Sequence, residues 1–135
     1  MIFLDSSFIV ACKIKDDEHH KKSIDFLIKL IEESDELLIT SDYIFDEVVT
    51  VIFGKTKNIE AAIDVGQTLK ISASILKIDE EIFEKAWKIF KQQKETRLSF
   101  TDCSTLALME KEGLKDIATF DRDFNKVKGI KVCIF

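Results

Sequence analysis

Short apolar runs alternate with longer amphipathic segments along this chain of 135 residues, and this alternation restricts the fold more than any other feature. The apolar runs predict strands at 2–4, 37–40, 74–78, 116–119 and 130–135. Strands that are separated by helices pair in parallel, with the helices covering both faces of the sheet. We therefore expect residues 1–135 to form a single α/β domain, a three-layer α/β/α fold with a central, mainly parallel five-stranded sheet.

The segments between these strands carry helix start signals and apolar stripes. Helices are expected after Ser6 or Ser7, over 20–34, after Ser41 or Asp42, over 58–69, after Asp79, and from Ser99 or Thr101 to Gly113. The stripes include Trp87 and phenylalanines at helical spacing, which we assign to the core. The adjacent His19 and His20 lie in a charged stretch, so we expect both side chains to be exposed.

The composition excludes several classes of protein. Apolar residues make up 46% of the chain, and no apolar run approaches the roughly 20 residues of a membrane span. Asp5 interrupts the apolar stretch that a signal peptide needs, so we expect a cytoplasmic protein without a membrane partner. Cys12, Cys103 and Cys133 are too scattered to predict a disulfide framework or a zinc site. The formal charge of −5 argues against non-specific coating of nucleic acid, but it permits an enzyme that contacts a few phosphates.

Acidic residues follow the predicted strands, at the edge where a doubly wound sheet places its functional site. Asp5 ends the first strand, and Asp121 follows the fourth strand with Asp123 two residues later. Asp102 lies in the first turn of the helix before the fourth strand. It shares an apolar stripe with later residues of that helix, so we expect it to face inward.

A fourth acidic position lies in the helix after the second strand, where Glu47 and Asp46 both flank the apolar face. Periodicity alone does not choose between them. Carboxylates that converge at a half-buried site repel one another, and a divalent cation removes that cost. Oxygen ligands without imidazole or thiolate favour Mg²⁺ or Mn²⁺. Such an ion activates water for attack on phosphorus, so this chemistry needs no histidine, serine or cysteine nucleophile.

Each acid also has an ordinary structural explanation. Asp5 could end a strand and cap a helix, and Asp102 could complement the helix dipole. Asp121 and Asp123 could be turn residues, and Glu47 could be a solvated helix flank. Their joint arrangement at one sheet edge is harder to explain in this way than any single member. Four hydroxyl side chains lie near these acids: Ser6, Ser7, Thr101 and Ser104. We expect them mainly to cap helices, and secondarily to orient carboxylates or water molecules.

Four segments at domain-sized spacing, 2–9, 43–49, 98–104 and 118–124, each carry one or two of these acids. In this order they resemble the motifs of the PIN-domain nucleases, and most closely the small single-domain toxins of the VapC type. The match runs over essentially the whole chain. The family pattern selects Glu47 in the second segment. Cys103 departs from that pattern, which more often has a small residue such as alanine there.

The resemblance implies a PIN-like fold with an acidic quartet of Asp5, Glu47, Asp102 and Asp121. Asp5 and Asp102 would be the direct metal ligands, Glu47 and Asp121 would complete the site or act through water, and Asp123 would be a weaker member. It also implies a Mg²⁺- or Mn²⁺-dependent endoribonuclease, usually a homodimer, that cuts structured RNA such as tRNA or rRNA. In toxin members a small antitoxin protein inhibits the enzyme. Some relatives process or survey RNA instead.

An acidic cleft repels phosphate, so cations must flank it if RNA is the substrate. The candidates for RNA-phosphate contacts are Lys13, Lys15, Lys55, Lys57, Arg97 and Arg122. One alternative is a non-catalytic RNA- or protein-binding module on the same scaffold. Against it stands the complete set of acids, because a module without catalysis gains nothing from holding mutually repelling carboxylates together. The other is a phosphoacceptor receiver domain, which needs paired acids after its first strand, whereas serines follow Asp5 here.

Overall fold

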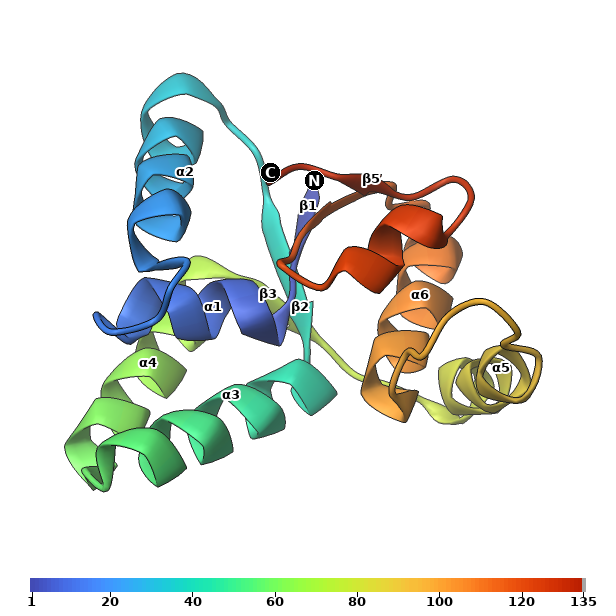
Figure 1. Ribbon diagram of the computed structural model, residues 1–135, viewed down its shortest axis with the longest axis horizontal. Coiled ribbons are helices and arrows are strands. Elements are labelled where there is room, and N and C mark those ends of the chain that lie inside the picture. Colours follow the sequence, from blue (N-terminus) through green and yellow to red (C-terminus); the bar gives the residue numbers. More distant parts are fainter. Residues whose placement is uncertain (135) are drawn as a thin grey trace.

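Five short strands form one sheet in the order β3-β2-β1-β4-β5 (Figure 1). The computed structural model describes residues 1–134. The strands are β1 (Ile2–Leu4), β2 (Leu38–Ser41), β3 (Ser74–Leu76), β4 (Asp116–Ala118) and β5 (Lys131–Val132). All four strand pairings are parallel. The predicted α/β fold with a five-stranded sheet is confirmed.

The helices cover the sheet in two sequential groups, one on each face (Figure 1). One face carries α1 (Ser6–Lys13), α2 (His20–Glu33), α3 (Asp42–Thr56) and α4 (Ile59–Ser72). The other carries α5 (Glu80–Lys91), α6 (Phe100–Glu112) and the short 3₁₀ helix η1 (Arg122–Lys126). Right-handed crossovers explain this division, because the chain steps outward from β1 to β3 and then returns past β1 to β4 and β5.

The strand order reverses between β1 and β4, and this reversal places the candidate site. At such a point the segments that follow the two strands diverge, which leaves space at the carboxyl edge of the sheet. Leu4 pairs with Ala118 in the β1–β4 ladder. The two following residues, Asp5 and Thr119, therefore lie side by side at this edge.

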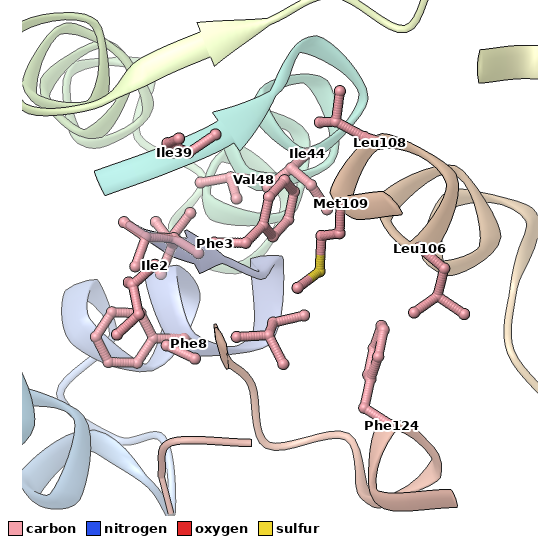
Figure 2. Packing of buried hydrophobic residues seen from close by; sticks show 14 of the residues in the cluster. Ile2, Phe3, Phe8, Ile39, Ile44, Val48, Leu106, Leu108, Met109 and Phe124 are labelled. Atoms are coloured by element: carbon pink, nitrogen blue, oxygen red, sulfur yellow. The ribbon is translucent and has the colours of Figure 1, made fainter. Parts of the chain in front are cut away.

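The core fixes the elements that carry the predicted acids. Phe3 of β1, Ile44 and Val48 of α3 and Met109 of α6 are fully buried in one cluster (Figure 2). Burial of an apolar side chain of this size contributes about 1.5–3 kcal/mol. Phe124 of η1 is buried in the same cluster and holds the segment after β4 against the domain.

Three strands are shorter than predicted, and β4 lacks only the last predicted residue, Thr119. β3 ends at Leu76 because the backbone N–H of Ile78 donates to Asp42 Oδ1 at 3.0 Å instead of joining the ladder. β5 covers two residues of the predicted 130–135, because the N–H of Ile130 donates to the carbonyl of Val127 in a turn at 3.4 Å. The last residue of that prediction, 135, lies outside the described residues.

The assignment of Trp87 and its neighbouring phenylalanines to the core is wrong. Phe83, Trp87 and Phe90 are 42%, 45% and 39% exposed. α5 buries Ile82 and Ala86 and packs the three rings on Phe100 of α6, with centroids between 5.1 and 6.5 Å from that ring. We call Phe83, Trp87, Phe90 and Phe100 the aromatic face. Helical spacing identified this stripe but could not tell whether another element covers it.

The histidine pair is half-buried, not exposed as predicted. His19 stacks on Phe120 with ring centroids 4.2 Å apart and an interplanar angle of 5°. His20 Nδ1 lies 2.7 Å from the carbonyl oxygen of Ala11. The turn before α2 folds both rings back onto neighbouring segments, a contact that local sequence does not reveal.

Composition led us to expect no disulfide framework and no membrane span. Cys12, Cys103 and Cys133 are free thiols, and Cys103 is buried in α6. Burial raises the pKa of the Cys103 thiol to about 11, and the charge of Asp102 adds to this rise. Among residues 1–134, no helix is long and apolar enough to span a bilayer.

Candidate active site

Asp5 is the buried centre of the carboxylate site. It occupies the N-cap position of α1, yet its side chain caps no backbone N–H. Its Oδ2 atom instead accepts hydrogen bonds from Thr119 Oγ1 at 2.6 Å and from Ser7 Oγ at 3.1 Å. Only 2% of Asp5 is exposed. The capping explanation for Asp5 therefore fails, and α1 begins at Ser6 without the serine cap that the sequence predicted.

The other carboxylate oxygen of Asp5, Oδ1, is buried and finds no hydrogen-bond partner among residues 1–134. Burial raises the pKa of Asp5 to about 6 and the charge of Asp102 adds to this rise, while the hydrogen bonds from the Thr119 and Ser7 hydroxyls oppose it. A cation stabilises a buried carboxylate oxygen that has no donor and stands near a second acid. Asp5 therefore fits a divalent metal ion.

Thr119 connects Asp5 with the segment after β4, and the sequence alone assigned it no role. Its hydroxyl donates to Asp5 and accepts from the N–H of Asp121 at 3.0 Å. The Ser7 hydroxyl, 3.2 Å from that of Thr119, accepts from the N–H of Phe120 at 3.0 Å. The available signal was position: Thr119 directly follows the strand that pairs with β1.

Asp102 serves both its helix and the site. Its Oδ2 accepts from the N–H of Ser99 at 3.0 Å, and Ser99 Oγ accepts from the N–H of Asp102 at 3.1 Å, which forms a capping box. Burial raises the pKa of Asp102, the Ser99 contacts lower it, and the charges of Asp121 and Asp123 raise it. The first-turn explanation is thus correct in part, and Asp102 is also half-buried towards the other acids.

Glu47 lies in the second turn of α3, at the rim of the site. Burial raises its pKa, and the charge of Asp102 is the next cause. Glu47 and Asp46 both line a surface hollow together with Thr101 of α6. Asp46 Oδ1 accepts a hydrogen bond from Thr50 Oγ1 of the same helix at 3.4 Å. The influence of Asp102 favours Glu47 as the member of the site, a choice that periodicity left open.

Asp121 and Asp123 shape the turn after β4. Asp121 Oδ1 accepts from the N–H of Asp123 at 2.9 Å and caps η1. Asp123 Oδ2 accepts from the N–H of Arg97 at 3.0 Å, and its Oδ1 pairs with Lys126 Nζ at 3.1 Å. These contacts lower the pKa of Asp123. Both acids therefore act as turn residues, as their structural explanation predicted. Their charges nevertheless raise the pKa of Asp102.

The predicted accessory hydroxyls differ in what they contact. The Ser6 hydroxyl lowers the pKa of Glu47 by hydrogen bonding. Thr101 lines the hollow beside Glu47. Ser104 is fully buried, and its hydroxyl donates to the Thr101 carbonyl at 2.6 Å. Ser104 thus contacts the backbone of the turn that carries Asp102, not a carboxylate.

The four predicted lysines do not gather at the site. Lys13 is the last residue of α1, at the end that points away from Asp5, and Lys15 follows two residues later. Lys13 Nζ pairs with Asp64 Oδ2 at 2.5 Å. Lys55 and Lys57 lie at the far end of α3, about 12 Å or more along the helix axis from the acid in its second turn.

The two predicted arginines lie closer. Arg97 donates its backbone N–H to Asp123, and Arg122 directly follows Asp121. Both side chains are exposed. The structure therefore brings the arginines, rather than the lysines, to the edge of the acidic site.

The acids are coupled through charge rather than direct contact. No three metal-ligating side chains within residues 1–134 stand close enough together to hold one ion. The charge of Asp102 nevertheless acts on Asp5 and on Glu47, and the charge of Asp121 acts on Asp102. Mg²⁺ commonly takes one or two carboxylates and keeps several waters. The donor set, oxygens only, fits such an ion.

Comparison with known proteins identifies the family. The chain matches the PIN domain over residues 2–130. It belongs to the PIN domain family. The resemblance seen in the four acidic segments is thereby confirmed. The 23S rRNA-specific endonuclease VapC20 of Mycobacterium tuberculosis is 24% identical to this PIN domain over 132 residues, which are 98% of each chain.

Solved structures share the fold of this PIN domain. The crystal structure of M. tuberculosis VapC20, named as a sarcin–ricin loop cleaving toxin, has a TM-score of 0.81 at 24% identity and covers 93% of this chain and 94% of its own. VapBC2 from Rickettsia felis, bound to a DNA fragment from its promoter, has a TM-score of 0.72 at 14% identity, with 98% and 97% covered. DNA-bound VapBC from Salmonella typhimurium has a TM-score of 0.69 at 17% identity, with 97% and 95% covered.

Proposed function

We propose that this PIN domain is a divalent-metal-dependent endoribonuclease and the toxin of a type II toxin–antitoxin pair in the cytoplasm. The observation that carries the proposal is Asp5. It lies at the switch point of the sheet, with one carboxylate oxygen buried and unpartnered and its pKa raised to about 6. In an acid with only a structural role, each carboxylate oxygen would be hydrogen-bonded or exposed. A site for a cation explains why an acid is kept here.

The proposed metal is Mg²⁺ or Mn²⁺, with Asp5 and Asp102 as direct ligands. Glu47 and Asp121 complete the site through water, and Asp123 is a weaker member because Arg97 and Lys126 engage its oxygens. When bound, such an ion supplies Lewis acidity and lowers the pKa of a water molecule.

The protein groups around the acids have distinct tasks in this proposal. Thr119 and Ser7 hold Asp5 through Oδ2, so that Oδ1 stays available as a ligand atom. The capping box with Ser99 fixes Asp102 on the first turn of α6. The raised pKa of Glu47 brings its carboxylate nearer to neutral pH, which suits it to accept a proton from an attacking water.

Ribosomal RNA is the proposed substrate. One relative supports this choice: VapC20 of M. tuberculosis is named as a 23S rRNA-specific endonuclease, and its crystal structure is named as that of a sarcin–ricin loop cleaving toxin. The test is cleavage of an end-labelled RNA hairpin that carries the sarcin–ricin loop, with EDTA, Mg²⁺ or Mn²⁺. Metal-dependent cleavage that Asp102→Asn abolishes is expected. Cleavage in EDTA, or by Asp102→Asn at the wild-type rate, would overturn the proposal.

A small antitoxin protein is the proposed partner. An apolar groove between α1, α2 and α4, lined among others by Phe8, Leu27, Ile31 and Leu69, supports a protein ligand at this face. Coexpression with the product of the neighbouring reading frame tests it. Ile31→Glu should escape inhibition, whereas Ile71→Glu, an exposed position outside the groove, should stay inhibited.

A homodimer formed through the aromatic face is also proposed. Phe83, Trp87 and Phe90 leave a contiguous aromatic surface on α5, extended by Phe100. Exposed apolar patches of this kind mark interaction surfaces, and aromatic side chains contribute strongly to them. A twofold dimer buries the same patch of each subunit, so the dimer would cover the aromatic face of both copies.

A further inference from the structure

A second pocket adjoins the acidic site on the side of β4. The segment after β4, the start of α2 and the end of β5 enclose it, and its lining includes His19, Lys22, Phe120, Arg122 and Lys126. Thr119 and Asp121 line the same pocket. Because Thr119 also donates to Asp5, the pocket and the buried carboxylate share a wall.

The pocket concentrates positive charge in a chain whose formal charge is −5. Lys22 and Arg122 are exposed, and within residues 1–134 neither has an ion-pair partner. Lys126 is shared with Asp123 at 3.1 Å, and His19 Nε2 lies 3.3 Å from Glu18. Two cations are therefore available to an anionic ligand.

The wall of the pocket is rigid and partly aromatic. His19 and Phe120 stack in parallel with centroids 4.2 Å apart. The N–H of His19 donates to Asp17 Oδ1 at 2.8 Å, and the N–H of Phe120 donates to Ser7 Oγ at 3.0 Å, which fixes both residues. A flat ring beside two cations suits a nucleotide, whose phosphate needs charge and whose base or sugar packs on rings.

We propose that this pocket binds a phosphate group of the RNA next to the phosphate that is cut, with Lys22 and Arg122 as its cations. This subsite rests on the proposed ribonuclease function. It answers an electrostatic need, because the carboxylates repel the RNA backbone and the predicted lysines lie at the far ends of α1 and α3. The shared wall with Asp5 places the subsite where the same strand would pass.

The test compares the double variant Lys22→Ala/Arg122→Ala with a charge-matched control, Lys29→Ala/Lys70→Ala. Lys29 lies on α2 outside the pocket, and Lys70 lies on α4. The probe is the sarcin–ricin-loop hairpin, with cleavage kinetics and filter binding measured over a range of salt concentrations. A single variant, Arg122→Lys, keeps the charge and should retain most of the wild-type affinity.

The pocket variant should raise KM by about tenfold with little change in kcat, because a phosphate contact away from the reacting atoms supports ground state and transition state alike. The slope of log affinity against log salt should become shallower by about 0.7, since the pocket holds one phosphate and each phosphate neutralised on single-stranded RNA contributes about 0.7. The control should match the wild type. Equal KM and equal slope for both double variants would overturn the subsite, as would weaker binding with an unchanged slope.

Failure of the subsite and failure of the ribonuclease proposal give different results. If the wild type cleaves the hairpin and the two double variants behave alike, only the subsite is wrong. If the wild type cuts no RNA, the proposed function fails. Filter binding in EDTA then decides the subsite by the same comparison of slopes.

Discussion

The Thr119 hydroxyl donates to Asp5 Oδ2 at 2.6 Å and so joins two residues that are 114 positions apart in the chain. The contact follows directly from the pairing of β1 with β4 at the switch point of the sheet. It opposes the effect of burial on the pKa of Asp5.

Replacing Thr119 by valine keeps the shape and removes the hydroxyl. The pKa of Asp5 should rise further, and metal affinity and RNA cleavage should fall by about 10–100-fold, the usual effect of losing a group that orients a metal ligand. Isothermal titration with Mn²⁺ and hairpin cleavage measure both. Thr119→Ser restores the donor and should recover most of the loss. Equal activity of the valine and serine variants would contradict this role.

The stability of the metal-free protein should fall as pH rises from about 4 to 7. The pKa of Asp5 is about 6 in the folded chain against 3.8 for an unperturbed aspartate. Between these values the folded chain binds more protons than the unfolded chain, so the free energy of unfolding decreases with pH, by about 3 kcal/mol in total. The raised pKa values of Glu47 and Asp102 act in the same direction.

Thermal unfolding in EDTA across this pH range measures the effect. The lowered pKa values of Asp79 and Asp123 give stability that is lost only as pH falls below about 4, so they do not mask the trend. Asp5→Asn removes the titrating group and should flatten the dependence. A slope that is unchanged in Asp5→Asn would show that burial of this acid does not limit stability.

Ser99→Ala should affect both stability and catalysis. The substitution breaks the capping box of α6 and should lower the free energy of unfolding by about 1 kcal/mol. It also removes a contact that lowers the pKa of Asp102. Asn58→Ala is the control, because the Asn58 side chain also caps a helix, α4, by accepting from the N–H of Glu60, but contacts none of the acids of the site. Chemical denaturation should give similar losses, and only Ser99→Ala should reduce cleavage.

Trp87→Lys should convert the proposed dimer into a monomer. It places a charge at the centre of the aromatic face, where a second copy would have to bury it. Sedimentation velocity measures the change. Ile71→Lys, at a position that is 87% exposed on α4, controls for adding a surface lysine and should leave the dimer intact. A wild type that sediments as a monomer would contradict the interface.

The sequence predicted the fold well because its strongest signals are periodic and local. The apolar runs that precede Asp5 and Asp121 predicted two parallel strands and located the carboxyl edge of the sheet. Gly113 ends α6 as predicted, in the left-handed conformation with φ at 69°. These features need only the neighbouring residues.

The remaining features depend on contacts between distant segments. The partnership of Thr119 with Asp5 requires the strand order, which composition and periodicity do not specify. The exposure of Trp87 depends on whether another element covers α5, and the stacking of His19 on Phe120 depends on how a turn folds back. The residue type indicates whether a side chain tends to be buried or exposed, but not which other side chains it contacts.

Direct Mn²⁺ binding tests the central claim, that buried Asp5 is kept for a divalent cation. Isothermal titration of the metal-free wild type at neutral pH, with Asp5→Asn and Asp102→Asn alongside, should give saturable binding to the wild type and loss of it in both variants. Asp123→Asn should lose much less, since its oxygens already have partners. Wild-type affinity in Asp5→Asn, or no binding to the wild type at millimolar Mn²⁺, would contradict the claim.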